Sequence, residues 1–357
     1  MNKLYAAHGT DAAALTRVLL ETLRPETGLD TGMFIGIKPN LVVAKDWRSG
    51  ATTNPAVCAA VIEFFQQRGF KNICIIESAW IGEDTNRAFR VCGYEELARR
   101  YGVELVDVKR DQYELCEYGG LKAEVSRRAL AIDYLINLPL IKGHSQTKLT
   151  CALKNMKGLV SDKDKRRFHT LGLHQPIAYL NRMIAPQLTI ADGTCADPGF
   201  EEGGRPVSLN TVVAGTDSVQ IDAYAAGLIG RKPGDIGYIG IAEKIGLGSA
   251  DLSNTEIVHL GAGSATAVDG RNEALERAKA HINAIDACSA CQANLLSALI
   301  RLDAIDDDLS VCVGQAFKGQ KGRIGSGSCT AGFDFSVKGC PPRADQIYEA
   351  LHQRRKT

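Results

Sequence analysis

Residues 33–78, MFIGIKPNLVVAKDWRSGATTNPAVCAAVIEFFQQRGFKNICIIES, contain the pattern that decides the fold. MFIGIKPNLVV predicts a strand that runs into a loop, and KNICIIES predicts a short apolar strand from a sheet covered on both faces. Between them, Asn54-Pro55 favours the start of a helix that ends at Gly69. A strand, a helix and a second strand in this order indicate a β-α-β unit with parallel strands.

The same alternation continues along the chain. We predict helices at YEELARRYG (94–102), TCALKNMKG (150–158) and SVQIDAYAAGLIG (218–230), and strands at VELVDV (103–108), DYLINLPLI (133–141), LTIADG (188–193) and NTVVAG (210–215). The expected fold class is therefore α/β, a parallel or mixed sheet with helices on both faces. A polar, helical stretch at 262–284 marks a boundary, so we expect an α/β domain over residues 1–275 and a small, cysteine-rich α/β domain over 276–357.

Composition narrows the classes of function. The chain has 357 residues, 45% of them hydrophobic, which suffices for a large core and two domains. A formal charge of +1 argues against the broad basic face of a nucleic-acid-binding protein. No apolar run approaches the roughly 20 residues of a membrane span, and the first residues lack a signal-peptide pattern. We expect a cytoplasmic protein with neither nucleic acid nor membrane as a partner.

Four cysteines in the last quarter form a complete ligand set for a metal centre. They occur as Cys288-Ser-Ala-Cys291, Gly-Ser-Cys329 and Lys-Gly-Cys340-Pro-Pro. Four thiolates can hold an iron–sulfur cluster or a structural zinc ion. Neighbouring glycines let backbone N–H groups approach sulfur closely, and a proline after cysteine also ends ferredoxin motifs.

The spacing favours a [4Fe–4S] cluster over zinc. A zinc ribbon usually supplies two Cys-x-x-Cys pairs, whereas only one is present here. Zinc remains the alternative metal, and a thiol or disulfide role is the third option. Cys312 lies within an apolar strand, so we expect it in the core and not among the ligands.

A second informative stretch is INLPLIKGHSQTKLTCALKNMKG, residues 136–158. Cations and polar groups that follow a strand suit an anionic ligand. The candidates for ligand binding are Lys148, Thr150, Asn155 and Lys157, and the candidates for catalysis are Lys142, His144 and Lys154. His144 is the preferred acid–base residue because histidine titrates near neutral pH. The alternative is a solvated polar loop and helix face.

Further candidates come from other segments. Lys38 and Asn40 follow the first predicted strand and would reach the site from a neighbouring loop; alternatively, Lys38 is a solvated charge at a strand end. His169 and His174 flank a short loop, and His174 would also suit the start of the helix HQPIAYLNRMI. Asp192 follows an apolar strand, where sites are often built, but Asp-Gly is also an ordinary turn.

The segments KPNLV, LPLIKGHSQTKLTCALKNMKG, IADG and GTDSVQIDA resemble the DUF362 family, over about residues 30–260. Some members of this family carry an appended iron–sulfur domain, which the cysteine-rich segment resembles. The strand followed by Ala-Leu-Lys-Asn is similar, more distantly, to the nickel-pincer lactate racemase family. The resemblance implies an α/β fold and a cytoplasmic, often anaerobic setting, but no reaction. Cys151, Ser218 and Gln220 depart from the common family residues.

Together these features predict an iron–sulfur oxidoreductase of an anionic small molecule. One alternative is a binding, assembly or redox-sensor protein with a structural cluster. The other is a non-redox isomerase or racemase that acts in the first domain. An electron-transfer protein is an expected partner, and the sequence leaves the oligomeric state open, with a homodimer as one option.

Overall fold

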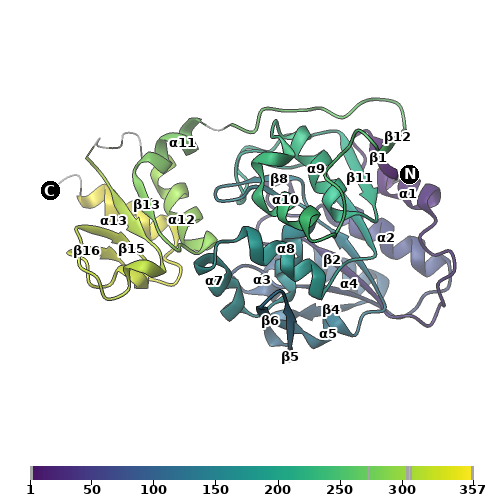
Figure 1. Cartoon of the computed structure of the whole chain (residues 1–357), viewed down its shortest axis with the longest axis horizontal. Helices are drawn as coiled ribbons and strands as arrows, with labels where there is room; N and C mark the ends of the chain where they lie inside the picture. Colours follow the sequence, from purple (N-terminus) through teal and green to yellow (C-terminus); the bar gives the residue numbers. More distant parts are fainter. Residues whose placement is uncertain (1–2, 272, 303–304, 306–307, 355–357) are drawn as a thin grey trace. The chain divides into compact units, whose positions relative to one another are not determined.

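The structure is a computed structural model that describes residues 3–271, 273–302, 305 and 308–354. The chain forms two compact units, both drawn in Figure 1. The first unit comprises residues 1–164 and 174–270, and the second comprises residues 165–173 and 271–357. The short segment 165–173 therefore packs with the second unit although it interrupts the sequence of the first.

The first unit is built on one eight-stranded sheet with the order β12-β1-β11-β10-β7-β2-β3-β4. β11 runs antiparallel to β1 and β10, and every other neighbouring pair is parallel. The strands are β1 Lys3–His8, β2 Ile35–Pro39, β3 Ile73–Glu77, β4 Glu104–Asp107, β7 Tyr134–Leu138, β10 Leu188–Asp192, β11 Thr211–Gly215 and β12 Glu256–Leu260. Two hairpins complete the strands, β5 Tyr113–Tyr118 with β6 Leu121–Ser126, and β8 Lys142–His144 with β9 Lys148–Thr150.

Helices cover both faces of this sheet (Figure 1). On one face lie α1 Ala12–Leu23, α2 Pro55–Gln67, α3 Thr85–Val91 and α4 Tyr94–Tyr101. On the other lie α6 Ala152–Asn155, α8 His174–Met183, α9 Ser218–Leu228 and α10 Gly237–Lys244, while α5 Arg127–Leu130 follows β6. The predicted α/β class with a mixed sheet is confirmed.

Local sequence signals account for the helix starts next to the sheet. Asn54 caps α2 by accepting a hydrogen bond from the Ala56 N–H at 3.0 Å, and Pro55 occupies the first helical position. Asp217 caps α9 by accepting from the N–H groups of Val219 and Gln220. Because these caps fix where each helix begins, they also fix the loops that leave the sheet.

The second unit contains a four-stranded sheet with the order β13-β14-β15-β16, and all of its strands are parallel. The strands are β13 Ile282–Ala284, β14 Val311–Val313, β15 Ile324–Ser326 and β16 Phe335–Val337. Its helices are α11 Glu273–Ala280, α12 Ser289–Ile300 and α13 Ala344–Arg354, together with the part of α7 Asp162–Thr170 that begins at Lys165. The helix expected within 262–284 is thus confined to its second half.

No helix among the described residues combines the length and the apolar run needed to cross a membrane.

Candidate functional site

Three strand ends and one helix start bring the four cysteines together. Cys288 follows β13, Cys329 follows β15 and Cys340 follows β16, each within a few residues of the end of the strand. Because the strands are parallel, these ends lie along one edge of the sheet. Cys291 joins them from the first turn of α12, for which Cys288 is the N-cap residue.

The four thiols line one cavity of about 280 Å3. Burial and the other three cysteines raise the pKa of Cys291 to about 12. Burial is the larger cause, and the contribution of the other cysteines shows that they lie near Cys291. All eleven cysteines lie in the described part of the chain, and none of them forms a disulfide.

Glycines supply much of the remaining wall. Gly314, Gly327 and Gly339 follow β14, β15 and β16 and all line the cavity. Gly327 has φ of +97°, and a Cβ atom there would lie 3.8 Å from Cys291 Sγ. Gly339 has φ of +142°, and its Cβ would lie 2.5 Å from Pro342 Cα. These backbone positions require glycine and keep the space between the sulfur atoms open.

Helix α7 contributes to the same cavity. Arg166 lines it, and Gln315 Nε2 donates to the Arg166 carbonyl and to Thr170 Oγ1, both at 3.1 Å. The same Nε2 lies 4.0 Å from Cys288 Sγ. The sequence analysis did not single out Arg166 or Gln315. Arg166 stands in the basic run 163–167, but nothing in the sequence indicates that this run packs against cysteines more than a hundred residues away.

His169 also belongs to this unit. Its Nε2 lies 3.4 Å from the N–H and 3.3 Å from the Oγ of Ser289, the residue after Cys288. His174 lies in the first unit, where its Nδ1 accepts a hydrogen bond from the Tyr238 N–H at 3.1 Å. His174 is also the first residue of α8, one of the two roles predicted for it. The two histidines therefore have different surroundings.

In the first unit, Lys38 forms a buried ion pair. Lys38 is the last residue but one of β2 and Glu77 ends the neighbouring β3. Lys38 Nζ lies 3.0 and 2.9 Å from the two carboxylate oxygens of Glu77. Burial lowers the pKa of Lys38, and Glu77 opposes that shift. Gly158 packs on the pair so closely that a Cβ atom would lie 2.0 Å from Glu77 Oε1. Lys38 therefore pairs with Glu77 inside the protein and is not a solvated charge at a strand end.

A ladder of buried amides ties α6 to the sheet. Asn40 Nδ2 donates to Asn155 Oδ1 at 2.9 Å, and Asn155 Nδ2 donates to Asn137 Oδ1 at 2.7 Å. Asn137 in turn donates to the Ala152 carbonyl at 2.9 Å. The buried Asn40 Oδ1 has no hydrogen-bond partner among the described residues. The predicted residues Asn40 and Asn155 therefore lie in direct contact.

Lys142 and Lys154 form a pair of largely buried cations. Lys142 Nζ donates to the carbonyl groups of Ala51 and Glu201, the latter at 2.9 Å, and Lys154 Nζ donates to Thr150 Oγ1 at 3.2 Å. Burial and the charge of Lys154 lower the pKa of Lys142 to about 7, and burial lowers that of Lys154 to about 8. Among the described residues, neither lysine forms an ion pair with a carboxylate.

His144 lies in the same region beside Glu201. The N–H groups of Gln146 and Thr147 donate to His144 Nδ1 at 3.1 and 3.2 Å, which leaves Nε2 to carry the proton of the neutral ring. Nε2 lies 3.7 Å from Glu201 Oε1. Glu201 is buried and also accepts from Ser145 Oγ at 2.6 Å. Glu201 is a residue that the sequence analysis missed, since it comes from the distant loop after β10.

The remaining candidates have separate surroundings. Lys148 is exposed at the start of β9, and Lys157 is partly buried. Asp192 is buried and accepts from the Asn54 N–H at 2.9 Å and from the N–H and hydroxyl of Thr194. Burial raises its pKa, which these hydrogen bonds oppose. Asp222 accepts from the N–H groups of Ala152 and Leu153 and so stabilises the start of α6, not a lysine.

Comparison with known proteins identifies relatives of the chain. The family model "Domain of unknown function (DUF362)" matches residues 35–227. A thylakoid-associated protein from Synechocystis sp. is 26% identical over 255 residues, 68% of this chain and 79% of that protein.

Two solved structures also share part of the fold. The lactate racemase apoprotein from Thermoanaerobacterium thermosaccharolyticum has a TM-score of 0.41 at 13% identity, over 59% of this chain and 54% of that one. A Thermotoga maritima protein has a TM-score of 0.40 at 12% identity, over 66% and 60%. The first is a lactate racemase, a family to which the sequence has a more distant similarity. At such TM-scores we base no functional argument on either structure.

The buried ion pair gives the first prediction. Lys38→Met leaves the Glu77 carboxylate buried without its partner, so the free energy of unfolding should fall by about 3–5 kcal/mol. The double variant Lys38→Met/Glu77→Leu removes both charges and should recover much of that loss. Urea unfolding followed by circular dichroism measures both, with Lys71→Met at an exposed lysine as the control. A loss below about 1 kcal/mol in the single variant would contradict a structural role for the pair.

The second prediction concerns pH. The folded-state pKa of Lys142, about 7, lies below the ordinary lysine value of 10.5. At a pH between these two values, Lys142 holds its proton in the unfolded chain and has lost it in the folded chain. Stability should therefore rise with pH over this window, by at most about 1.4 kcal/mol per pH unit. Lys142→Met should flatten that slope, whereas Lys71→Met should retain it. Equal slopes in wild type and Lys142→Met would refute the assignment.

Proposed function

This chain belongs to the DUF362 family, and we propose that it is an iron–sulfur oxidoreductase. The description of the family assigns no activity. In this proposal the second unit holds a [4Fe–4S] cluster through Cys288, Cys291, Cys329 and Cys340. The first unit binds an anionic small molecule around Lys142 and Lys154. The observation that carries the proposal is that cysteines from three strand ends and one helix start line a single cavity.

The donor set fits a cluster better than a single zinc ion. Zinc draws four ligands to one point, with each sulfur about 2.3 Å from the metal. Among the described residues, no three histidine, cysteine or carboxylate side chains lie close enough together to hold a metal ion directly, and this applies to the four thiols as well. The thiols surround a cavity of about 280 Å3. A [4Fe–4S] cluster needs such an arrangement because each cysteine binds a different iron.

The residues around the cavity would perform definite tasks toward the cluster. The N-terminus of α12 would stabilise the thiolates of Cys288 and Cys291, because helix N–H groups and the helix dipole favour negative charge. Gln315 Nε2 is placed to donate a hydrogen bond to Cys288 Sγ. Gly327 brings backbone close to Cys291 Sγ. When bound, such a cluster supplies electrons one at a time, at a potential that these contacts tune.

The lysine pair of the first unit supports an anionic ligand. Buried charges in proteins are normally paired, and the buried Lys38 has a carboxylate partner. Lys142 and Lys154 donate only to carbonyl and hydroxyl oxygens among the described residues, while the charge of Glu201 partly offsets theirs. A carboxylate or phosphate of a ligand at this position would provide further countercharge. His144, with Nε2 near Glu201, is the residue that would exchange a proton with the ligand.

A non-redox enzyme is the second candidate, and the pKa of Lys142 favours it. At about 7, this pKa leaves a substantial fraction of the amine neutral at physiological pH. A neutral lysine can remove a proton from a carbon acid, as an isomerase or racemase requires. In that case the first unit would act alone and the cluster would be structural or a redox sensor. The cytoplasm, a reducing compartment, would keep the thiols available in either case.

The third prediction tests the metal centre. Protein purified without oxygen should contain about four iron and four sulfide per chain, with a broad visible band that dithionite bleaches. Cys340→Ser should lose most of the iron, whereas Cys312→Ser, at a fifth cysteine of the same unit, should retain it. Circular dichroism shows whether each variant is folded. Colourless protein with about one zinc per chain would refute the cluster.

The fourth prediction tests the anion site. At about pH 8, binding an anion should raise the pKa values of Lys142 and Lys154, so binding should take up protons. Calorimetric titration with inorganic phosphate and with lactate, in two buffers of different ionisation enthalpy, measures this uptake. Affinity should fall as the pH rises above 8. Lys154→Met should weaken binding about tenfold or more, and Lys71→Met should not.

Binding of these anions without proton uptake, or unchanged by Lys154→Met, would place the anion site elsewhere. If an anion binds and turns over without any change in the oxidation state of the iron, the non-redox candidate replaces the oxidoreductase.

A further inference from the structure

A second cavity in the second unit, of about 310 Å3, takes no part in the proposed metal centre. It lies where β14 and β15 separate. One register pair, Cys312 with Gly325, joins these strands, whereas three pairs join each of the flanking strand pairs. We call this cavity the trough. Its volume falls at the lower end of the range of small-molecule sites, roughly 300–1,000 Å3.

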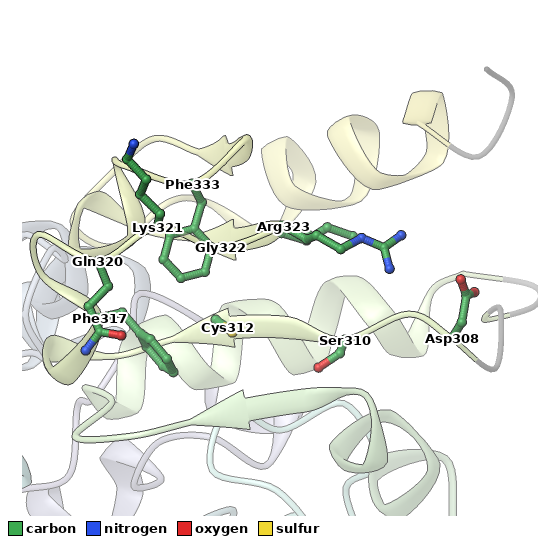
Figure 2. A pocket seen from close by; sticks show the side chains of 10 residues that line it. Asp308, Ser310, Cys312, Phe317, Gln320, Lys321, Gly322, Arg323 and Phe333 are labelled. Atoms are coloured by element: carbon green, nitrogen blue, oxygen red, sulfur yellow. The ribbon is translucent and has the colours of Figure 1, made fainter.

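The trough combines an aromatic part with a polar part. Figure 2 shows Phe317 and Phe333 near Lys321 and Gln320, with Arg323, Ser310 and Asp308 further along. The two rings meet edge to face, with centroids 5.9 Å apart. The ring of Phe333 also packs directly on the backbone of Gly322, where a Cβ atom would lie 2.4 Å from the ring. An aromatic ring of a ligand can pack in such surroundings.

The charged side chains of the trough favour an anion. Lys321 and Arg323 are exposed, and neither pairs with a carboxylate in the part of the chain that the structure describes. Two other cations of this unit are paired, Lys279 with Glu276 and Arg343 with Asp345. The segment 309–333 contains no acidic residue, although Asp308, just before it, also lines the trough. Arginine suits a phosphate or carboxylate group, which it can bind with two hydrogen bonds.

We infer that the trough binds an aromatic anion of about the size of a mononucleotide. Its ring would lie against Phe317 and Phe333, with a polar atom at the edge of the ring accepting a hydrogen bond from Lys321. Its phosphate or carboxylate would lie further along the trough, against Arg323. Ser310 and Asp308 would remain for hydroxyl groups of the ligand. This site goes beyond the proposed function and does not depend on it, because none of its side chains belongs to the cysteine or lysine sites.

The trough also lies close to the cysteine cavity along the chain. β14 supplies Cys312 to the trough and Val313 to the cysteine cavity. In the same way, Phe317 lines the trough and the next residue, Lys318, lines the cysteine cavity. A ligand in the trough would thus be separated from the cysteine cavity by a thin layer of backbone. This arrangement makes a redox-active mononucleotide the most informative probe.

The fifth prediction uses flavin mononucleotide and adenosine monophosphate as probes. With the full-length protein purified without oxygen, we expect saturable one-to-one binding of both, by quenching of flavin fluorescence and by calorimetry. Each should compete with the other. Arg323→Gln and Lys321→Gln should each weaken binding about tenfold, the loss expected for one charged hydrogen bond. Lys338→Gln, at another exposed cation of this unit, should leave the affinity unchanged.

Several outcomes would overturn the inference. One is the absence of saturable binding of both probes to folded protein. Another is binding that Arg323→Gln and Lys321→Gln leave unchanged, which would place the probes elsewhere. A third is displacement by inorganic phosphate at the same concentration as adenosine monophosphate, since the aromatic wall would then contribute nothing. Circular dichroism and iron content establish that each variant is folded as the wild type is.

Discussion

In a parallel sheet the carboxyl ends of the strands lie at the same edge, so the loops that follow the strands all start from that edge. In the second unit this constraint is complete, because all four strands are parallel, and it brings Cys288, Cys329 and Cys340 to one cavity. In the first unit it holds for β10, β7, β2, β3 and β4. Glu77 and Asp192 are the last residues of their strands, and Lys38 is the last but one of β2. Strand direction therefore accounts for the position of the cysteine site and of the Lys38–Glu77 ion pair.

Several buried polar groups of the first unit are compensated within the protein: Lys38 by Glu77, Asn155 by its two asparagine neighbours, and Asp192 by Thr194 and the Asn54 N–H. Lys142 and Lys154 differ from Lys38, since carbonyl and hydroxyl oxygens only partly offset the cost of burying their charge. Proteins retain such costs mostly at functional sites, where pKa values are shifted for a purpose.

The sequence predicted the features that depend on local pattern. Asn54-Pro55 marked the start of α2, and the segment 218–230 marked α9. The α/β class followed from the same alternation of strands and helices. Each of these features depends on residues within one or two turns of each other, and a sequence displays such relations directly.

Long-range packing accounts for what the sequence did not predict. Glu201 lies against His144 only because the loop after β10 folds back on the β8–β9 hairpin. The segment 165–173 packs with the second unit through bonds such as Gln315 to the Arg166 carbonyl, which joins residues 149 positions apart. His169 therefore lies beside Ser289. No periodicity or motif in a single sequence encodes a pairing of that range.

The central claim is that the four cysteines of the second unit hold iron. Anomalous diffraction at the iron absorption edge, from crystals grown without oxygen, tests it most directly. The claim predicts a compact group of iron atoms bounded by Cys288, Cys291, Cys329 and Cys340, with one sulfur ligand from each. A single atom that scatters anomalously at the zinc edge, or iron bound anywhere else in the chain, would contradict it.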